Sequence, residues 1–315
     1  MSSIKLVRRM PLIALLTVVG LGVEARGSGG APTQSEELSR PVRSGSKTTY
    51  FDLLRLLLPD LKADATAHKS IPLPALSEPR ETEAIKGDIE FDFKPYWFRS
   101  GGERLLLLWV NLRAEGANEA TPFEGEAAVL AVYRLEPKVE MLDALDVKTD
   151  RFTGFWEDRP LFRLDSRNDA FVVYSTHWNA GESYLSLDML FVDAGRIKTI
   201  ASRFIYNTQG CGVGYTETPY FRAVADPGNK YPRVLVTVRL RKESDARECD
   251  RRTRGYTKYY RGLYRWNPAG RRYETSSRQL DALDKFDERR VSSSAAGRTP
   301  SAILRRAPRR LAAGA

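Results

Sequence analysis

The sequence has few of the side chains that usually carry chemistry. Histidine and cysteine occur twice each, and methionine four times, in 315 residues. Two histidines cannot build a three-histidine zinc site, and neither a His-Glu-x-x-His motif nor a Cys-x-x-Cys spacing occurs. A Gly-x-Ser-x-Gly motif and a phosphate-binding loop are also missing. The sequence therefore predicts no metal, no cofactor and no recognisable catalytic centre.

Both cysteines, Cys211 and Cys249, lie in the second half of the chain. An oxidising compartment would let them pair, so a disulfide is predicted. It would close a loop of about 38 residues and stabilise the fold by roughly 4 kcal/mol on the chain-entropy model. The alternative is a redox or nucleophilic cysteine, which usually requires a second cysteine nearby or a positioned histidine.

Long apolar runs are absent after the first residues of the chain. Near the N-terminus, Lys5, Arg8 and Arg9 precede an apolar stretch from Met10 to Val23, and Val23-Glu24-Ala25 places small residues at minus three and minus one. The stretch is shorter than the roughly 20 residues of a membrane helix and fits a secretory signal. Residues 1–25 are predicted to be a cleaved signal peptide, with an uncleaved anchor as the alternative. The mature chain, without a transmembrane segment, is then exported to the periplasm or the extracellular space.

The two ends of the mature chain lack the residues needed to form a core. Residues 26–48 contain no aromatic side chain, and residues 288–315 contain seven arginines but only one acid, Glu288. A disordered leader and a disordered basic tail are predicted, leaving residues 49–287 as a single β-repeat domain. The tail carries much of the formal net charge of +10. It is either simply solvated or touches anionic lipid or nucleic acid, and no specific nucleic-acid partner is predicted.

One helix and one irregular segment open the domain. Phe51, Leu54, Leu57 and Leu58 share a helical face, which predicts a helix over residues 50–58, capped by Thr48 or Thr49 and ended by Pro59. Residues 59–86 mix proline with charge and fit neither the helical nor the strand period. They are predicted to be an irregular strap that lies over the domain and covers a sheet edge.

From residue 87 onward a four-strand pattern occurs three times. Each unit begins with an aromatic strand ending in arginine, followed by a polar turn, an apolar strand, a variable loop, a third strand, a hairpin turn and a fourth strand. The predicted strands are residues 95–99, 104–112, 128–135 and 139–145; then 160–163, 170–178, 184–192 and 196–204; then 219–222, 233–240, 259–266 and 271–280. The fold is therefore predicted to be mainly β, with three four-stranded antiparallel meanders.

This order of elements, with hairpins such as Tyr-Arg-Leu-Glu-Pro and Tyr-Arg-Trp-Asn-Pro-Ala-Gly, resembles the degenerate blades of secreted bacterial FG-GAP-like, propeller-type proteins over residues 88–284. The resemblance implies a propeller-like array. Three blades are fewer than the four to eight of a closed propeller, so an open array is expected, with sandwich-like packing as the alternative. The family's blades carry an acidic calcium loop, whereas here Arg167 interrupts the corresponding loop 165–169, which disfavours calcium.

Aromatic side chains are the remaining candidates for a binding site. Of the five tryptophans, Trp178 stands beside His177 where a predicted strand meets a loop, so this pair is the predicted contact site. Packing at the core or its rim is the alternative for both residues. The repeats and the absence of a catalytic motif favour an exported non-catalytic binding protein whose partner is an envelope protein or a glycan. The alternative is an exported hydrolase with a dispersed site.

Overall fold

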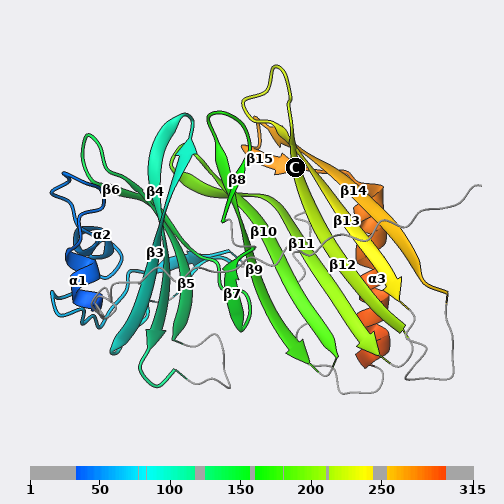
Figure 1. The fold of residues 1–315 in the computed structure, drawn as a ribbon, viewed down its shortest axis with the longest axis horizontal. Coiled ribbons are helices and arrows are strands. Elements are labelled where there is room, and N and C mark those ends of the chain that lie inside the picture. The colour runs from blue at the N-terminus through cyan, green and yellow to red at the C-terminus, as the bar shows by residue number, and fades with distance from the viewer. Residues whose placement is uncertain are drawn as a thin grey trace, which may run out of the picture. The chain divides into compact units, whose positions relative to one another are not determined.

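The structure is a computed structural model that describes residues 33–76, 78–82, 84–117, 125–156, 160–179, 181–210, 213–243 and 254–295. These segments contain fifteen strands and three helices, so the chain is mainly β, as predicted (Figure 1). The predicted signal peptide, residues 1–25, lies outside the described residues, as does the tail beyond residue 295. None of the helices described is both long enough and apolar enough to cross a membrane.

The first predicted meander is confirmed as the main part of a six-stranded sheet, sheet 1. Its strands are β1 (Leu73–Ala75), β2 (Glu78–Thr82), β3 (Ile89–Ser100), β4 (Glu103–Ala114), β5 (Glu126–Arg134) and β6 (Glu140–Asp146), in the order β2-β1-β6-β5-β4-β3. Strands β3 to β6 pair antiparallel in chain order. The predicted strap supplies β1 and β2, and β1 pairs with β6. The strap thus covers one edge of the sheet, but it is more regular than the sequence indicates.

The second and third meanders share one nine-stranded sheet, sheet 2. Its strands are β7 (Phe152–Phe155), β8 (Leu161–Arg163), β9 (Asp169–Asn179), β10 (Glu182–Asp193), β11 (Arg196–Gly210), β12 (Val213–Val224), β13 (Arg233–Glu243), β14 (Tyr256–Asn267) and β15 (Arg272–Glu274). The order is β15-β14-β13-β12-β11-β10-β9-β7, and β8 also pairs with β9. Because β11 pairs with β12, the last two units do not form separate blades, and the propeller-like array is not confirmed.

Helix α2 (Tyr50–Leu54) starts where the sequence predicts. Thr49 is its N-cap and forms a capping box with Asp52, which satisfies backbone N–H groups of the first turn. The regular helix is shorter than predicted, although Leu58 N still donates to Leu54 O at 2.7 Å. Helix α1 (Gln34–Ser39) was not predicted, because it falls in the supposed disordered leader. That prediction is wrong for residues 33–48, since Leu38 and Val42 are buried in the core of sheet 1.

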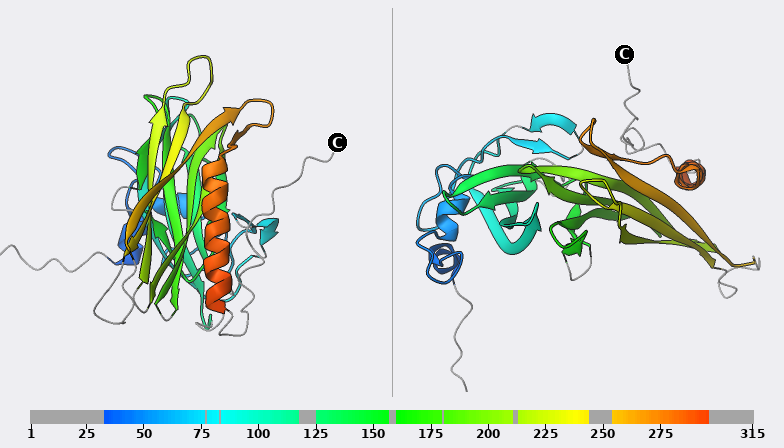
Figure 2. Two further views of the ribbon diagram at one scale, coloured as in Figure 1. Left: turned by 90° about the vertical axis from the view of Figure 1, so that its right-hand side faces the viewer. Right: turned by 90° about the horizontal axis from the view of Figure 1, so that it is seen from above.

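The fourth strand predicted for the last unit, residues 271–280, is wrong beyond the short β15. The chain instead forms α3 (Arg278–Ala295), which also takes up residues 288–295 of the predicted disordered tail. Leu280, Leu283 and Phe286 recur every three residues and pack against sheet 2, which is the spacing of a helix face. Ser277 starts the helix, with its hydroxyl accepting from the Leu280 N–H at 3.2 Å. The helix runs alongside β14 and β11 (Figure 2).

A polar cluster holds α3 on sheet 2. Arg290 forms ion pairs with Asp287 of the same helix and with Glu217 of β12, whose side chain is fully buried. The guanidinium carbon lies 4.9 Å and 5.0 Å from the ring centres of Tyr206 and Tyr215, which adds cation–π attraction. Closer to the start of α3, Arg203 of β11 binds Asp284 at 2.5 Å. The helix is therefore attached by charge as well as by apolar packing.

Three apolar cores organise the described part of the chain. The first lies between sheet 1 and the α1–α2 region, and the second fills the space between sheet 2 and α3. The third draws residues from both sheets, including Phe98 and Trp109 of sheet 1 and Phe171 and Val192 of sheet 2. Sheet 1 and sheet 2 therefore pack face to face over the area of this shared core.

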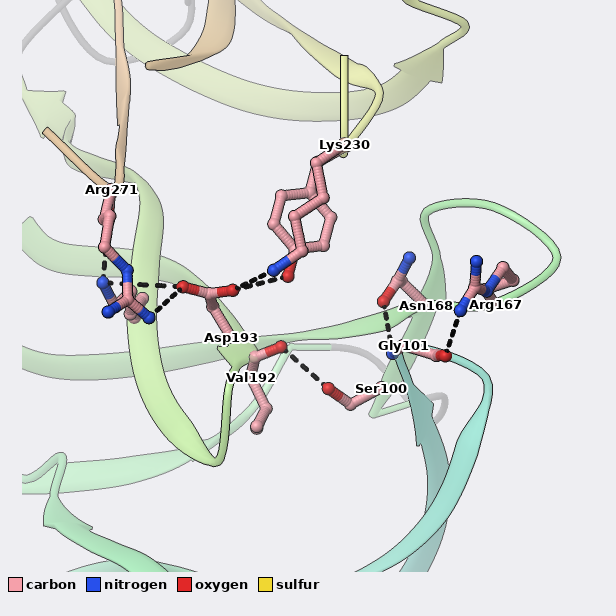
Figure 3. Close-up of polar contacts among 10 residues, drawn as sticks. Ser100, Gly101, Arg167, Asn168, Val192, Asp193, Lys230 and Arg271 are labelled. Carbon is pink, nitrogen blue, oxygen red and sulfur yellow. Dashed lines mark hydrogen bonds and ion pairs between the residues drawn. The ribbon is translucent and has the colours of Figure 1, made fainter. Parts of the chain in front are cut away.

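Polar contacts reinforce the junction of the sheets at the turn between β3 and β4 (Figure 3). Ser100 Oγ donates to the Val192 carbonyl at 2.9 Å, and the Gly101 N–H donates to Asn168 Oδ1 at 2.8 Å. Arg167 returns a bond to the Gly101 carbonyl at 2.6 Å. The loop 165–169, which corresponds to the calcium loop of the FG-GAP-like blades, therefore helps to join the two sheets.

Next to this turn, the carboxylate of Asp193 is buried among donors. Lys230 Nζ and Tyr231 OH lie 2.7 Å from its Oδ1, and Arg271 lies 3.0 Å from its Oδ2 (Figure 3). Burial raises the pKa of Asp193, but these hydrogen bonds outweigh it and lower the pKa to about 2. The turn between β10 and β11 is in this way attached to the turns around residues 230 and 271.

Candidate functional site

One face of sheet 1 changes from apolar to polar along its strands. Trp109 lies in the shared core, and Asn111, two residues further along β4, points to the same face because strand side chains alternate. Asn111 pairs in register with Asp92, and Arg113 pairs with Glu126. The inter-sheet face therefore continues past the core as a polar surface.

This polar surface forms one wall of a groove. The opposite wall comes from the segment before β7, from β7 itself and from β9. The groove encloses about 580 Å³ and is lined by Glu90, Phe91, Asp92, Asn111, Leu112, Arg113, Glu126, Ala127, Ala128, Lys148, Arg151, Phe152, Thr153 and Tyr174. Its size falls within the range of roughly 300–1,000 Å³ that small-molecule sites occupy.

Hydrogen bonds fix the polar side chains of the sheet 1 wall. Trp109 Nε1 donates to Asn111 Oδ1 at 2.9 Å, and the Asn111 amide donates to the Asp92 carboxylate at 2.9 and 3.1 Å. Glu126 forms ion pairs with Lys148 and with Arg113, the latter at 3.5 Å. The wall thus presents preoriented planar groups, which suit hydrogen bonding to hydroxyl groups.

Two exposed aromatic rings lie beside the groove. Phe152 lines it and is 48% exposed, and Trp178 is 64% exposed with its ring centre 5.2 Å from that of Phe152. This exposure agrees with a surface position for Trp178 and excludes packing inside the core, whereas packing at the rim, here against Phe152, remains compatible with it. The role of Trp178 as a contact residue stays a prediction. Phe152 was missed, because β7 is only four residues long and no repeat unit includes it.

His177, the second predicted contact residue, is largely enclosed. Its ring stacks on Tyr184 at 4.6 Å, and its Nδ1 lies 2.5 Å from the carboxylate of Asp150. Only 19% of the His177 side chain is exposed. Asp150 lies in the sequence between the groove residues Lys148 and Arg151. By binding Asp150, His177 therefore stabilises the wall of the groove, and of the two predicted contact residues only Trp178 is largely exposed.

A carboxyl group with an altered affinity for protons lies under the groove. Asp146 accepts the backbone N–H groups of Ala128 and Lys148, two lining residues, at 3.1 and 3.0 Å. Burial raises the pKa of Asp146 to about 6, against the effect of these two hydrogen bonds. The pKa of Asp188 is raised to about 6 for the same reason, but Asp188 is not among the lining residues. Among the residues described, no group of three or more potential metal ligands occurs.

The predicted disulfide falls on residues outside the described segments. Cys211 precedes β12 and Cys249 lies in the connection from β13 to β14. The described ends of these strands are neighbours, since Gly214 pairs with Glu243 and Lys242 pairs with Tyr256. The pairing of the two cysteines therefore stays a prediction.

Comparisons with protein-family models, with curated proteins and with solved structures find no match for this chain. The resemblance to FG-GAP-like proteins stays a prediction from the sequence, and the function has to be argued from the groove.

Proposed function

We propose that the chain is an exported, non-catalytic binding protein that holds an uncharged glycan in the groove between its sheets. The observation that carries the proposal is the exposed pair Phe152 and Trp178 beside a wall of oriented polar side chains. Sugar rings have apolar C–H faces that pack on aromatic rings, and hydroxyl edges that need donors and acceptors. The groove offers both kinds of contact.

The charge of the groove favours a neutral ligand. Its lining contains three acids, Glu90, Asp92 and Glu126, and three bases, Arg113, Lys148 and Arg151. Glu126 is held by two of the bases, and the Asp92 carboxylate is held by Asn111. A charged ligand would meet no excess of the opposite charge, whereas a neutral polar ligand can use these groups as donors and acceptors.

The groove gives less support to a hydrolase or to a receptor for an envelope protein. A glycosidase needs a carboxyl group of raised pKa exposed beside the scissile bond and a second carboxylate facing it. Of the described carboxyl groups with raised pKa, which are Asp146, Asp188, Glu217 and Asp287, only Asp146 lies next to the lining, and it is buried beneath the groove. An envelope protein as the partner would need a broad contact surface, about 800 Å² on each side, which a narrow groove does not offer. In this proposal the meanders act as an open, propeller-like array that presents the groove, and the Cys211–Cys249 disulfide stabilises the exported form.

The proposal is tested by titrating the purified chain with neutral oligosaccharides from cell-envelope glycans, followed by calorimetry and tryptophan fluorescence. We expect Trp178→Ala and Phe152→Ala each to weaken binding tenfold or more, because each removes one stacking ring. Leu56→Ala is the matched control, since Leu56 is also an exposed apolar side chain (39%) but belongs to the α2 region. It should change affinity by less than twofold.

A second readout separates binding from hydrolysis. The glycan recovered after long incubation should be unchanged by mass spectrometry. Release of shorter fragments that is lost in Asp146→Asn would contradict a non-catalytic function. Equal loss of affinity in Trp178→Ala and Leu56→Ala would remove the groove as the binding site.

A further inference from the structure

The outward face of strands β12, β13 and β14 carries an unusual concentration of arginine. Along these strands the residues Glu217, Val236, Val238 and Gly262 point to the buried side, towards α3. The alternate residues point away from it. Six arginines share that outward side, and we call them the arginine face: Arg222, Arg233, Arg239, Arg241, Arg261 and Arg265.

Few acids compensate this charge. Within the three strands, the one acid on the outward side is Glu243, which binds Arg241 at 2.8 Å. In the neighbouring β15, Glu274 stands opposite Arg265 in register, and its carboxylate binds Arg272. Asp226, in the turn after β12, lies 3.5 Å from Arg233. No ion pair within the described segments involves Arg222, Arg261 or Arg265, and all three side chains are exposed. The folded domain therefore has a strongly positive surface of its own, in addition to the arginines near the C-terminus.

Beside the arginines, the outward side carries hydroxyl-bearing and aromatic side chains, and the half-buried Leu235 and Leu263 lie between them. Threonine occupies positions 216, 218, 237 and 257, and Tyr220 and Tyr259 are 45% and 54% exposed. The guanidinium of Arg239 lies over the Tyr220 ring, 5.6 Å from its centre, and also donates to Thr218 Oγ1 at 3.3 Å. One ring face of Tyr220 is thus occupied, and Tyr259 is the more exposed of the two rings.

We infer that the arginine face binds an anionic polysaccharide. Guanidinium groups recognise carboxylate, sulfate and phosphate groups through paired hydrogen bonds, and a row of them fits a chain with repeated negative charges. Single-stranded nucleic acid is the competing polyanion, but it gains much of its affinity from bases stacked on several open aromatic rings. With only two exposed tyrosines, one of them already covered on one face by Arg239, and with four threonine hydroxyl groups, this face fits a charged sugar chain better. This surface is separate from the neutral-glycan groove, and either inference can fail without the other.

The test compares two triple variants of the full chain with equal net charge. The face variant is Arg222→Gln with Arg261→Gln and Arg265→Gln. The control variant is Arg40→Gln with Arg55→Gln and Arg104→Gln, three exposed arginines that each lie over an aromatic ring in the part of the chain belonging to sheet 1. Heparin, polygalacturonate and an oligothymidylate are the probes, titrated by calorimetry at two salt concentrations. Near-ultraviolet circular dichroism and Tm establish that each variant is folded.

We expect the full chain to bind heparin and polygalacturonate with an affinity that falls as salt rises. The face variant should bind at least tenfold more weakly, and the control variant less than twofold. Equal weakening of both variants would show that net charge alone binds the probe and would overturn the inference. The absence of binding by the unmodified chain, or unchanged binding by the face variant, would also overturn it. Tighter binding of the oligothymidylate than of either polysaccharide would assign the face to nucleic acid instead.

Discussion

Asp193 shows how one buried acid can join distant turns of the chain. Its carboxylate receives hydrogen bonds from Lys230, Tyr231 and Arg271, which come from two different connections of sheet 2. A buried charge is costly unless such partners compensate it. The sequence contains no sign of this arrangement, because the partners are separated from Asp193 by 37, 38 and 78 residues.

The replacement Asp193→Asn is predicted to destabilise the chain at neutral pH. The pKa of Asp193 is lowered from 3.8 to about 2 in the folded state. A lowered pKa means that the carboxylate stabilises the fold above pH 4 and that this contribution is lost as pH falls from about 4 to about 2. The shift corresponds to about 2 kcal/mol in the free energy of unfolding. Urea unfolding at pH 7 and pH 3 should therefore show a larger difference between variant and wild type at pH 7.

Tyr231→Phe is the control for this effect, since it removes one donor and leaves the charge of Asp193 in place. It should cost less than Asp193→Asn at pH 7. A difference between wild type and Asp193→Asn that is the same at pH 7 and pH 3 would show that the charge of Asp193 is not what stabilises the turn.

At the scale of elements, α3 depends on close packing against β14. A Cβ atom on Gly262 would lie 2.2 Å from Leu280 Cδ1 and 3.1 Å from the Cβ of Ser277. Gly262→Ala is therefore predicted to push α3 away from the sheet and to cost about 1–3 kcal/mol, the usual range for overpacking. Gly270→Ala is the matched control, because its Cβ would come no closer than 3.5 Å to Arg272 and Asn267. Thermal unfolding gives the cost, and hydrogen exchange in α3 shows whether the helix is the part that loosens.

The buried acids Glu217 and Asp287 make the stability of the contact between α3 and sheet 2 depend on pH. Glu217 is buried, and both burial and the neighbouring carboxylate of Asp287 raise the pKa of Glu217, while Arg290 acts in the opposite direction. The protonated form of Glu217 is thus the stable one in the fold, so the contribution of this carboxyl group to stability is complete below its usual pKa of 4.5 and declines as pH rises above it. Arg203 and Asp284 face the same region and balance each other's charge.

Glu217→Gln is predicted to remove this decline, because glutamine resembles the protonated acid and carries no charge. Between pH 5 and pH 9 the free energy of unfolding of wild type should fall, whereas that of Glu217→Gln should fall less. Curves for the two proteins that stay parallel over this range would contradict the assignment of the proton to this cluster. Glu274→Gln is a suitable control, since Glu274 lies in β15 and binds Arg272 at 2.8 Å at the surface.

The sequence predicts elements better than it predicts their neighbours. Strand periodicity locates β3 to β6 and β9 to β14, and the Thr49 cap locates α2, because these signals are local. The α3 helix was missed, since residues 271–280 were assigned to a strand by analogy with the first two units. Trp178 could be proposed from its place at a strand end, but the groove could not. Its lining comes from five strands and one connection, and only the pairing register brings Asp92 beside Asn111.

At the scale of the molecule, the two sheets are connected through a small shared core. Phe98 of β3 and Phe171 of β9 lie edge to face with ring centres 5.4 Å apart, and both side chains are buried. The groove begins where this core ends, so its walls keep their spacing only if the core holds the sheets together. The binding site and the stability of the inter-sheet contact are therefore linked.

A double-mutant cycle across the core measures this link. Phe98→Leu and Phe171→Leu are predicted to destabilise the chain individually, and the double variant should lose less than the sum, with a coupling of about 0.5–1.5 kcal/mol from the edge-to-face pair. Phe98→Leu with Phe191→Leu is the control cycle, because Phe191 belongs to the core under α3 and should give additive losses. Coupling in the first cycle together with weaker glycan binding in Phe171→Leu would establish that the shared core sets the geometry of the groove. Additive losses in both cycles would mean that the sheets are stabilised independently, and the groove would then have to be shaped by the hydrogen bonds of its own walls.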